Sequence, residues 1–320
     1  MPLFCSIFRI RPTYSEAYSE IASYRPDAII WRFNITSVPG IFNPKKVHPG
    51  ICFISEHQAK EIEELRMSTA GQMAAPIIQK LRDKVLRNID AVIGVTEEIT
   101  HYELACVKRK IPSYTMTNGI DVDSYPRKNT LLREKDHLRL LYVGSHTAQW
   151  QGFDRVLEGI AAYHGDAQIG LHVAGTLNES TRQLIKKLGV EHHIHDHGYL
   201  EGISLDRLFD DCDIAVGTLG MHRKNLTFGS TLKVREYMAR GIPFIISYTD
   251  DDLTPDLPYV FMAPADDSPI DMYHVHQFTT QLYRSHGESL STDMHSYAVE
   301  HMDYRMKINR LLDFITTQLQ

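Results

Sequence analysis

Positive charge at the expected start of a helix is the feature of this sequence with the clearest chemical meaning. The stretch GSTLKVREYMARG, residues 229–241, reads as a helix capped by Ser230, with Lys233 in its first turn and Arg235 shortly after. Acidic residues are normally favoured there, because a helix N-terminus carries unpaired N–H groups and the positive end of the helix dipole. A bound anion would explain the lysine. The alternative is that both cations are solvated, with Glu236 as a local partner.

The residues around this helix start favour the anion. A strand is predicted to end near residue 218, the loop after it carries Arg223 and Lys224, and Gly229-Ser230 opens the helix. In open α/β sheets, ligands bind at the carboxyl ends of strands, where helix N-termini point. Free N–H groups, a small entrance and nearby cations together predict a phosphate site. Glu236, one turn later, could accept a hydrogen bond from a hydroxylated group such as a ribose.

Composition and charge restrict the class of protein. The chain has 320 residues, 43% hydrophobic and 23% charged, as in ordinary globular proteins, and a net charge of -6 argues against a general nucleic-acid binder. There is no apolar run long enough for a transmembrane helix, and the apolar start is too short for a secretory signal. Four widely spaced cysteines predict reduced, buried thiols in a cytoplasmic protein: Cys5, Cys52, Cys106 and Cys212.

Alternating apolar runs and amphipathic stretches predict βαβ units and parallel sheets. The predicted strands are 27–33, 50–55, 90–96, 113–119, 138–144, 169–175, 193–200, 213–219 and 243–248. The predicted helices are 13–24, 57–68, 74–88, 97–108, 152–164, 180–189, 204–212, the one that begins at Ser230, and 294–319 with a bend near Met302.

A polar, proline-containing stretch at 121–137 interrupts this pattern and reads as a linker. We therefore expect an α/β protein with two Rossmann-like domains, residues 1–132 and 133–300, and a C-terminal helix at 301–320 that returns to the first domain. The N-terminal domain lacks a glycine-containing strand–turn–helix at its start, so it is expected to be short by a βα unit, either naturally or because the sequence is truncated.

Several segments resemble motifs of the retaining GT-B glycosyltransferases of the large family 4 group, also called glycosyl transferases group 1. STLKVREYMARGIPFIIS is similar to the pattern SPLKxxEYMAxGxPVxxS. Four more segments agree in the right order: AVIGVTEEI, TNGIDVDSY, LLYVGSHTAQWQGFDRVLEGI and HGYLEGISLDRLFDDCDIAVGTL. The resemblance covers about residues 90–315 and is weak before that. It implies a GT-B fold, with two parallel-sheet domains facing across a cleft.

The resemblance also implies a nucleotide-sugar donor, held mainly by the second domain, and an acceptor on the first. Glu236 matches the second glutamate of an E-x7-E motif, which binds the donor ribose. The remaining donor-binding positions that it implies are Gly144, Ser145, Tyr199, Leu200, Gly229, Ser230, Thr231 and Leu232. A first-domain histidine of the family could correspond to His57, or Glu56 could fill that space; a core or helix-capping role for His57 is equally open.

Three positions depart from the family pattern. Phe228 stands where the first glutamate of E-x7-E is expected, and Gln151 stands where a lysine often precedes a glycine. The arginine of the phosphate loop is replaced by Ser145 or His146. Arg223, Lys224 and Lys233 could supply the missing positive charge, because a departing diphosphate needs neutralisation.

Three further features have plain explanations. The histidine-rich stretch 191–198 is more consistent with a strand than with a zinc site, and DDD at 250–252 reads as an exposed loop rather than a ligand set. The basic segments 80–88 and 106–112 could contact an anionic membrane, as in relatives that use lipid-linked acceptors, but a solvated helix face is the better interpretation.

The sequence thus predicts a retaining hexosyltransferase-type enzyme of surface polysaccharide synthesis, with His57, Lys233 and Glu236 as catalytic candidates. Its expected partners are a nucleotide-diphosphate sugar and a glycan or lipid-linked acceptor, with no nucleic acid. We expect no cofactor and no metal, and a cytoplasmic location, with peripheral contact to the inner membrane face left open. The alternatives are a GT-B relative that binds a nucleotide without efficient transfer and, less favoured, a sugar-nucleotide epimerase.

Overall fold

The computed structural model describes residues 15–34, 42–129, 136–145 and 148–319. The expectations for Cys5, for His146 and for the start of the sequence lie outside these residues. The chain divides into two compact units, one formed by Met1–Thr117 with Lys307–Gln320 and the other by Asn118–Met306.

The first unit is built on a parallel sheet of four strands in the order β1-β2-β3-β4. The strands are β1 (Ala28–Arg32), β2 (Cys52–His57), β3 (Ala91–Gly94) and β4 (Ser113–Thr115). The helices that connect them are α2 (Glu61–Arg66), α3 (Thr69–Leu86) and α4 (Glu97–Val107), preceded by a helix at 15–24. Ser68 and Thr96 cap α3 and α4 by accepting backbone hydrogen bonds, which explains where these helices begin.

Both faces of this sheet are buried. Alternate residues of β2 point to opposite sides, so Phe53 packs with residues of α3 and α4, while Ile54 packs with Leu311. Leu311 belongs to α11 (Tyr304–Gln318), and Phe314 of the same helix stacks on Tyr114 at 5.3 Å between ring centroids. The C-terminal helix therefore supplies one side of the core of the first unit.

The second unit is built on a parallel sheet of six strands in the order β10-β9-β8-β5-β6-β7. These are β5 (His137–Val143), β6 (Gln168–Ala174), β7 (Ile194–Gly198), β8 (Ile214–Val216), β9 (Phe244–Ile246) and β10 (Val260–Met262). The helices are α5 (Phe153–Ala161), α6 (Glu179–Leu188), α7 (Gly202–Asp211), α8 (Leu232–Arg240), α9 (Met272–His286) and α10 (Leu290–His301).

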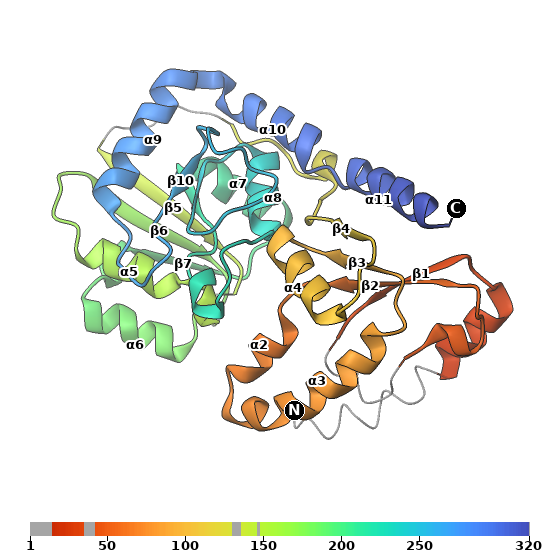
Figure 1. The fold of residues 1–320 in the computed structure, drawn as a ribbon. Coiled ribbons are helices and arrows are strands. Elements are labelled where there is room, and N and C mark those ends of the chain that lie inside the picture. Colours follow the sequence, from red (N-terminus) through yellow and green to blue (C-terminus); the bar gives the residue numbers. More distant parts are fainter. Residues whose placement is uncertain (1–14, 35–41, 130–135, 146–147, 320) are drawn as a thin grey trace. The chain divides into compact units, whose positions relative to one another are not determined.

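Helices cover both faces of this larger sheet, as the near-continuous apolar runs of its strands require. Leu138, Leu140 and Tyr142 of β5 face a core shared with α5, α6 and α9, whereas Leu141 faces a core shared with α7, α8 and α10. Figure 1 shows α5 and α6 on one side of the sheet and α7 and α8 on the other. This doubly wound arrangement confirms the predicted Rossmann-like class.

The structure departs from the predicted boundaries in three places. Residues 118–129 group with the second unit, since buried Lys128 donates its ammonium to the carbonyls of Phe209, Asp210 and Cys212 at the end of α7. The single helix expected at the C-terminus is two helices, α10 and α11, because the helical conformation is interrupted at Met302–Asp303. Strand β10 and helix α9 were not predicted.

The described residues contain no helix that is both long and apolar enough to span a membrane. Cys52 and Cys212 are buried and Cys106 is half-buried, all three as free thiols. The predicted burial holds for Cys52 and Cys212, whereas Cys106 is only half-buried.

Two glycines have the same backbone conformation but differ in how closely other atoms pack against them, so the cost of a steric clash can be measured apart from the cost of positive φ. Gly152 (φ 68°) precedes α5 and Gly189 (φ 70°) follows α6. A Cβ on Gly152 would lie 2.7 Å from the carbonyl carbon of Leu219, whereas one on Gly189 meets nothing within 4 Å.

We expect Gly152→Ala to lower the free energy of unfolding by about 2–4 kcal/mol and Gly189→Ala by about 1 kcal/mol, because only the first adds a backbone clash to the strain of positive φ. Urea denaturation of both variants measures the difference. Equal losses would show that the contact between Gly152 and Leu219 does not constrain the fold.

Candidate functional site

The carboxyl ends of the second unit's strands lie at one edge of the sheet, because all of its strands are parallel. Gly144 follows β5, Gly175 follows β6 and Tyr199 follows β7. The backbone N–H of Gly144 donates to Ala174 (2.8 Å), and that of Gly175 donates to Gly198 (2.7 Å), so these turns are tied to one another. Gly144 has φ 104°, a conformation that favours glycine.

Helix α8 begins without a capping side chain. Thr231 occupies the N-cap position predicted for Ser230, and its side chain makes no capping hydrogen bond. The Thr231 hydroxyl instead pairs with the hydroxyl of Tyr248 (2.8 Å), while the Ser230 hydroxyl accepts from the backbone N–H of Asn118 (2.8 Å). No side chain of the described residues caps the first N–H groups of α8, which are therefore open to water or to an anion.

A buried ion pair fixes the position of this helix start. Arg235 has no exposed surface; it is bonded to both carboxylate oxygens of Asp250, pairs with Asp252 and donates its Nε–H to the carbonyl of Asn118 (2.9 Å). Asp250 is 2% exposed, so the expectation of an exposed DDD loop is wrong for its first residue. The alternative that Arg235 is solvated is excluded by its burial.

Lys233 is half-buried beside the turn after β5. Its ammonium donates to the side-chain oxygen of Gln151 (3.0 Å) and lies 4.0 Å from the ring centroid of Tyr142. A Cβ on Gly144 would be 3.5 Å from its Cε. Among the described residues it forms no ion pair, and burial lowers the pKa of its ammonium to about 7.

The contact with Gln151 bears on a departure noted in the sequence. Gln151 stands where a lysine was expected, and its amide oxygen accepts from the ammonium of Lys233. Gln151 is 8% exposed, and the Tyr142 hydroxyl also lies 3.4 Å from its oxygen. The Lys233 ammonium thus places a positive charge beside Gln151, at the position where the family often has a lysine.

Glu236 lies one turn after Lys233 on α8. Its carboxylate accepts a hydrogen bond from Arg240 Nε (2.8 Å), and Arg240 also pairs with Asp206 (2.7 Å). The Glu236 side chain is 21% exposed. Arg240 therefore holds a partly accessible carboxylate in place one turn beyond the open helix end.

The positions implied for the base and the phosphate loop are more open. Tyr199 is 77% exposed and its hydroxyl donates to Glu201 (3.0 Å), while Leu200 packs against the core on the α7 side. Ser145 is exposed, and its backbone carbonyl accepts from the hydroxyl of Tyr142 (2.9 Å). Gly229 is buried against the ring of Tyr248, and Leu232 is exposed.

The loop cations are already engaged. Arg223 forms two hydrogen bonds to Asp154 (2.9 and 2.7 Å) and a third to Asp267 (2.7 Å). The ammonium of Lys224 lies 4.9 Å from the ring centroid of Trp150. Two carboxylates neutralise Arg223, so its predicted role in holding a diphosphate gains no support from this geometry.

One pocket of about 620 Å³ opens between the first turns of α5 and α6. Its lining includes Asp154, Ser180, Thr181 and Arg223. Of the sequence-predicted donor residues it contains Arg223 alone, and three acidic residues line it (Asp154, Glu158 and Asp267). A pocket of this charge does not suit a diphosphate, so the start of α8 is the better candidate site.

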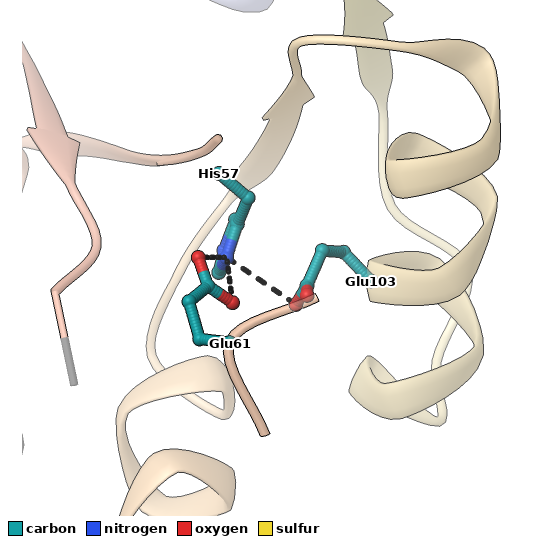
Figure 2. Close-up of side chains that lie close together, drawn as sticks. All are labelled: His57, Glu61 and Glu103. Atoms are coloured by element: carbon teal, nitrogen blue, oxygen red, sulfur yellow. Dashed lines mark hydrogen bonds and ion pairs between the residues drawn. The ribbon is translucent and has the colours of Figure 1, made fainter. Parts of the chain in front are cut away.

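His57 lies in the first unit as the last residue of β2, within a buried cluster (Figure 2). The ring has no exposed surface and stacks on Phe33 at 5.1 Å between centroids. One ring nitrogen lies 2.8 Å from the hydroxyl of Ser55, and the other faces Glu61 and Glu103. A fully buried ring has no surface to offer a sugar, so the predicted catalytic role of His57 gains no support here.

Burial also controls ionisation in this cluster. It lowers the pKa of His57 to about 4, raises the pKa of Glu61 to about 7 and raises the pKa of Glu103. Arg82 is fully buried and hydrogen-bonded to Glu103, which partly offsets the two carboxylates. Glu56, the other residue considered for this role, pairs instead with Arg32 (2.9 Å).

The sequence did not predict the residues that hold the start of α8 in place. Asn118, Tyr248 and Asp250 hold the start of α8, yet they lie 112, 17 and 15 residues from their partners in the sequence. Asn118 belongs to the TNGIDVDSY segment, which resembles a family motif but does not by itself indicate a contact with the start of α8. The unusual lysine in a first helical turn was the signal that could be read locally.

The fold matches known sugar-transferring enzymes. Residues 137–268 match the family described as Glycosyl transferases group 1, while no curated protein matches the sequence. Sucrose-phosphate synthase from Thermosynechococcus elongatus has a similar structure, with a TM-score of 0.72 and 12% identity over 99% of this chain and 80% of that one.

Two further solved structures have a similar fold. Anabaena HepE in complex with UDP-glucose gives a TM-score of 0.63 and 12% identity over 96% of this chain and 82% of that one. The lipopolysaccharide outer core galactosyltransferase WaaB, in its apo form, gives 0.63 and 13% identity over 98% and 81%. At these identities the likeness shows the fold.

The two units therefore have the GT-B class of fold, as predicted. Within the second unit, residues 137–268 match the glycosyl transferases group 1 family.

We expect Asp250→Asn to lower the free energy of unfolding by about 3–5 kcal/mol, because it leaves the buried Arg235 guanidinium undercompensated. The exposed Asp256 provides a control, and Asp256→Asn should change stability by less than about 0.5 kcal/mol. Thermal or urea unfolding measures both. A small loss for Asp250→Asn would mean that Asp252 alone balances the arginine.

Proposed function

We propose that this protein is a retaining, metal-independent glycosyltransferase that uses a nucleotide-diphosphate sugar, with the diphosphate bound at the start of α8. The observation that carries the proposal is the Lys233 ammonium, which has no carboxylate partner among the described residues, beside a helix end that no side chain caps. A dianion at this point would receive both the helix N–H groups and the lysine charge.

The chemistry of the transfer follows from these groups. As the bond between the sugar C1 and the diphosphate oxygen lengthens, positive charge develops on the sugar ring and negative charge on the leaving group. The ammonium of Lys233 and the N–H groups of α8 stabilise that negative charge without a metal ion. The acceptor hydroxyl bonds to C1 from the same face and passes its proton to the departing phosphate oxygen, so the configuration is retained.

We assign Glu236 to the donor ribose and the turn at Gly144 and Ser145 to the phosphates. The support is that Glu236 lies one turn from Lys233 and that Gly144 adjoins the Lys233 side chain. Tyr199 and Leu200, which follow β7 at the same sheet edge, are proposed to flank the base. HepE has been solved with UDP and UDP-glucose, which makes uracil the first base to test.

The proposal also concerns the acceptor and the pathway in which the enzyme acts. We infer a glycan or lipid-linked acceptor and a role in surface polysaccharide synthesis, in the cytoplasm or at the inner membrane face. The support is the fold shared with a lipopolysaccharide galactosyltransferase.

The affinity for UDP should depend on pH through Lys233. The pKa of Lys233 is about 7 without ligand, and a bound dianion must raise it, so binding takes up a proton above that pH. Affinity should be full below about pH 7 and fall by up to tenfold per unit above it. Lys233→Met should weaken UDP binding roughly 5- to 150-fold at pH 6.5, the equivalent of about 1–3 kcal/mol, and remove the pH slope.

Calorimetry with UDP and with uridine, from pH 6.5 to 9, measures this effect. The nucleoside lacks the diphosphate, so its binding should not respond to the substitution or to pH. An equal loss for both ligands would contradict the assignment of the diphosphate to α8.

A second function rests on Phe228. This residue stands where the family has a glutamate that contacts the donor sugar, and its backbone is bridged to Thr249 beside the start of α8. A phenyl ring cannot hydrogen-bond a sugar hydroxyl, so the protein could bind a nucleotide without efficient transfer.

Phe228→Glu separates the two functions. If transfer was lost through this position, the variant should gain a glycosylated product over the wild type, detected by mass spectrometry with UDP-sugars and oligosaccharide acceptors. If the wild type already forms the product and the variant adds nothing, another group holds the sugar and the enzyme proposal stands. Neither protein forming product, although both bind UDP, would favour the binding protein.

A further inference from the structure

We propose that His57, Glu61 and Glu103 bind one divalent transition-metal ion, of the Zn²⁺ type, inside the first unit. Each residue offers one ligand atom, and the three atoms lie within 4.8 Å of one another. This ion is structural and takes no part in the proposed sugar transfer, so the two proposals stand or fall separately.

The three side chains come from three different elements and converge on one point (Figure 2). His57 ends β2, Glu61 begins α2 and Glu103 lies on α4. The His57 and Glu103 side chains have no exposed surface, whereas that of Glu61 is 11% exposed. An ion could therefore enter past Glu61 and would join a strand to the two helices that pack near its end.

The distances suit shared ligands better than direct hydrogen bonds. His57 Nδ1 lies 3.3 and 3.5 Å from the two carboxylate oxygens of Glu61 and 3.5 Å from Glu103 Oε2. An N–H···O hydrogen bond is usually about 2.7–3.2 Å long. Ligands about 2.1 Å from a tetrahedral zinc ion are about 3.4 Å apart, which is the spacing observed here.

The other nitrogen of His57 already has a partner. Nε2 lies 2.8 Å from the hydroxyl of Ser55. In the tautomer in which Nε2–H donates to Ser55, the lone pair of Nδ1 points toward both carboxylates. A hydrogen-bond partner on the far side of the ring is the usual support of a metal-binding histidine.

Glu103 provides an independent sign of a ligand. It is fully buried, its Oε2 accepts from Arg82, and its Oε1 has no hydrogen-bond partner among the described residues. Figure 2 shows the carboxyl group directed at the His57 ring. A buried carboxylate oxygen without a partner is costly and indicates an ion or a water molecule that completes the site.

The charges leave room for a cation. Two carboxylates face one permanent cation, Arg82, so the cluster with neutral imidazole carries an excess of one negative charge when both glutamates are ionised. Glu103 Oε2 accepts from Arg82 and is also the oxygen nearest to His57, whereas Oε1 has no hydrogen-bond partner among the described residues, so the carboxylate keeps a lone pair for an ion. A mixture of imidazole nitrogen and carboxylate oxygen favours zinc and its first-row neighbours over magnesium, which prefers six oxygen ligands.

A second group of histidines must be controlled for. His172, His195 and His197 stack on neighbouring strands of the second unit, and His172 Nδ1 lies 3.0 Å from His197 Nε2. Exposed imidazoles can take up metal ions without any built site. The double variant His172→Gln/His197→Gln removes this competitor.

The test uses the full chain stripped of metal with a chelator and titrated with Co²⁺, whose visible absorption reports its ligands. We expect one ion per chain in the wild type, displaced by Zn²⁺. Glu61→Gln keeps the size of a partly exposed side chain and should weaken Co²⁺ binding at least tenfold. Glu63→Gln, on the same helix, is the matched control and should bind as the wild type does, as should the double histidine variant.

Three results would overturn the proposal: no stoichiometric Co²⁺ binding by the wild type, equal binding by Glu61→Gln, or binding that disappears with His172 and His197. X-ray absorption of the wild-type complex counts the imidazole ligands of the ion directly. Because it uses the wild type alone, misfolding of a variant does not affect the result. One imidazole ligand supports the site, and two or more contradict it. A bound ion should also raise the melting temperature of the wild type, because it binds the folded state alone.

Discussion

The geometry of the candidate donor site depends on one buried ion pair. Arg235 lies inside α8, and its guanidinium joins Asp250, Asp252 and the backbone of Asn118. These contacts bring two loops from distant parts of the sequence against the first turn of the helix. The hydroxyls of Ser230 and Thr231, which could have capped the helix, are used by Asn118 and Tyr248 instead. The uncapped end of α8 is thus a consequence of how its surroundings are held.

Lys233, on the same helix, differs from Arg235 because it has no carboxylate partner among the described residues. Arg235 is balanced by two carboxylates, whereas Lys233 is given an amide oxygen and an aromatic face, which bind an ammonium weakly and cannot neutralise it. Desolvation without a counter-charge is why its pKa falls to about 7. A fold that keeps an unbalanced lysine at the positive end of a helix gains stability when an anion binds there.

The first unit contains the reverse imbalance. Around His57 there are one buried and one half-buried carboxyl group and one arginine, and burial raises the pKa values of both glutamates. Each unit therefore places an imbalance of ionisable groups near the end of parallel strands: a lysine without a carboxylate partner among the described residues in the second unit, and more carboxyl groups than arginines in the first. The same rule of sheet topology explains both places, since strand ends are where side chains from several elements converge.

The sequence by itself determined the class of fold and the start of α8. Apolar runs of four to seven residues between amphipathic stretches specify parallel sheets covered on both faces, and a lysine in a first helical turn is anomalous wherever it occurs. Tertiary structure alone decided what surrounds that lysine. Gln151 and Tyr142 lie 82 and 91 residues away from Lys233 in the sequence, and the partners of Arg223 and His57 also come from other elements. Burial and charge balance arise from contacts between elements, and no local pattern of residues encodes them.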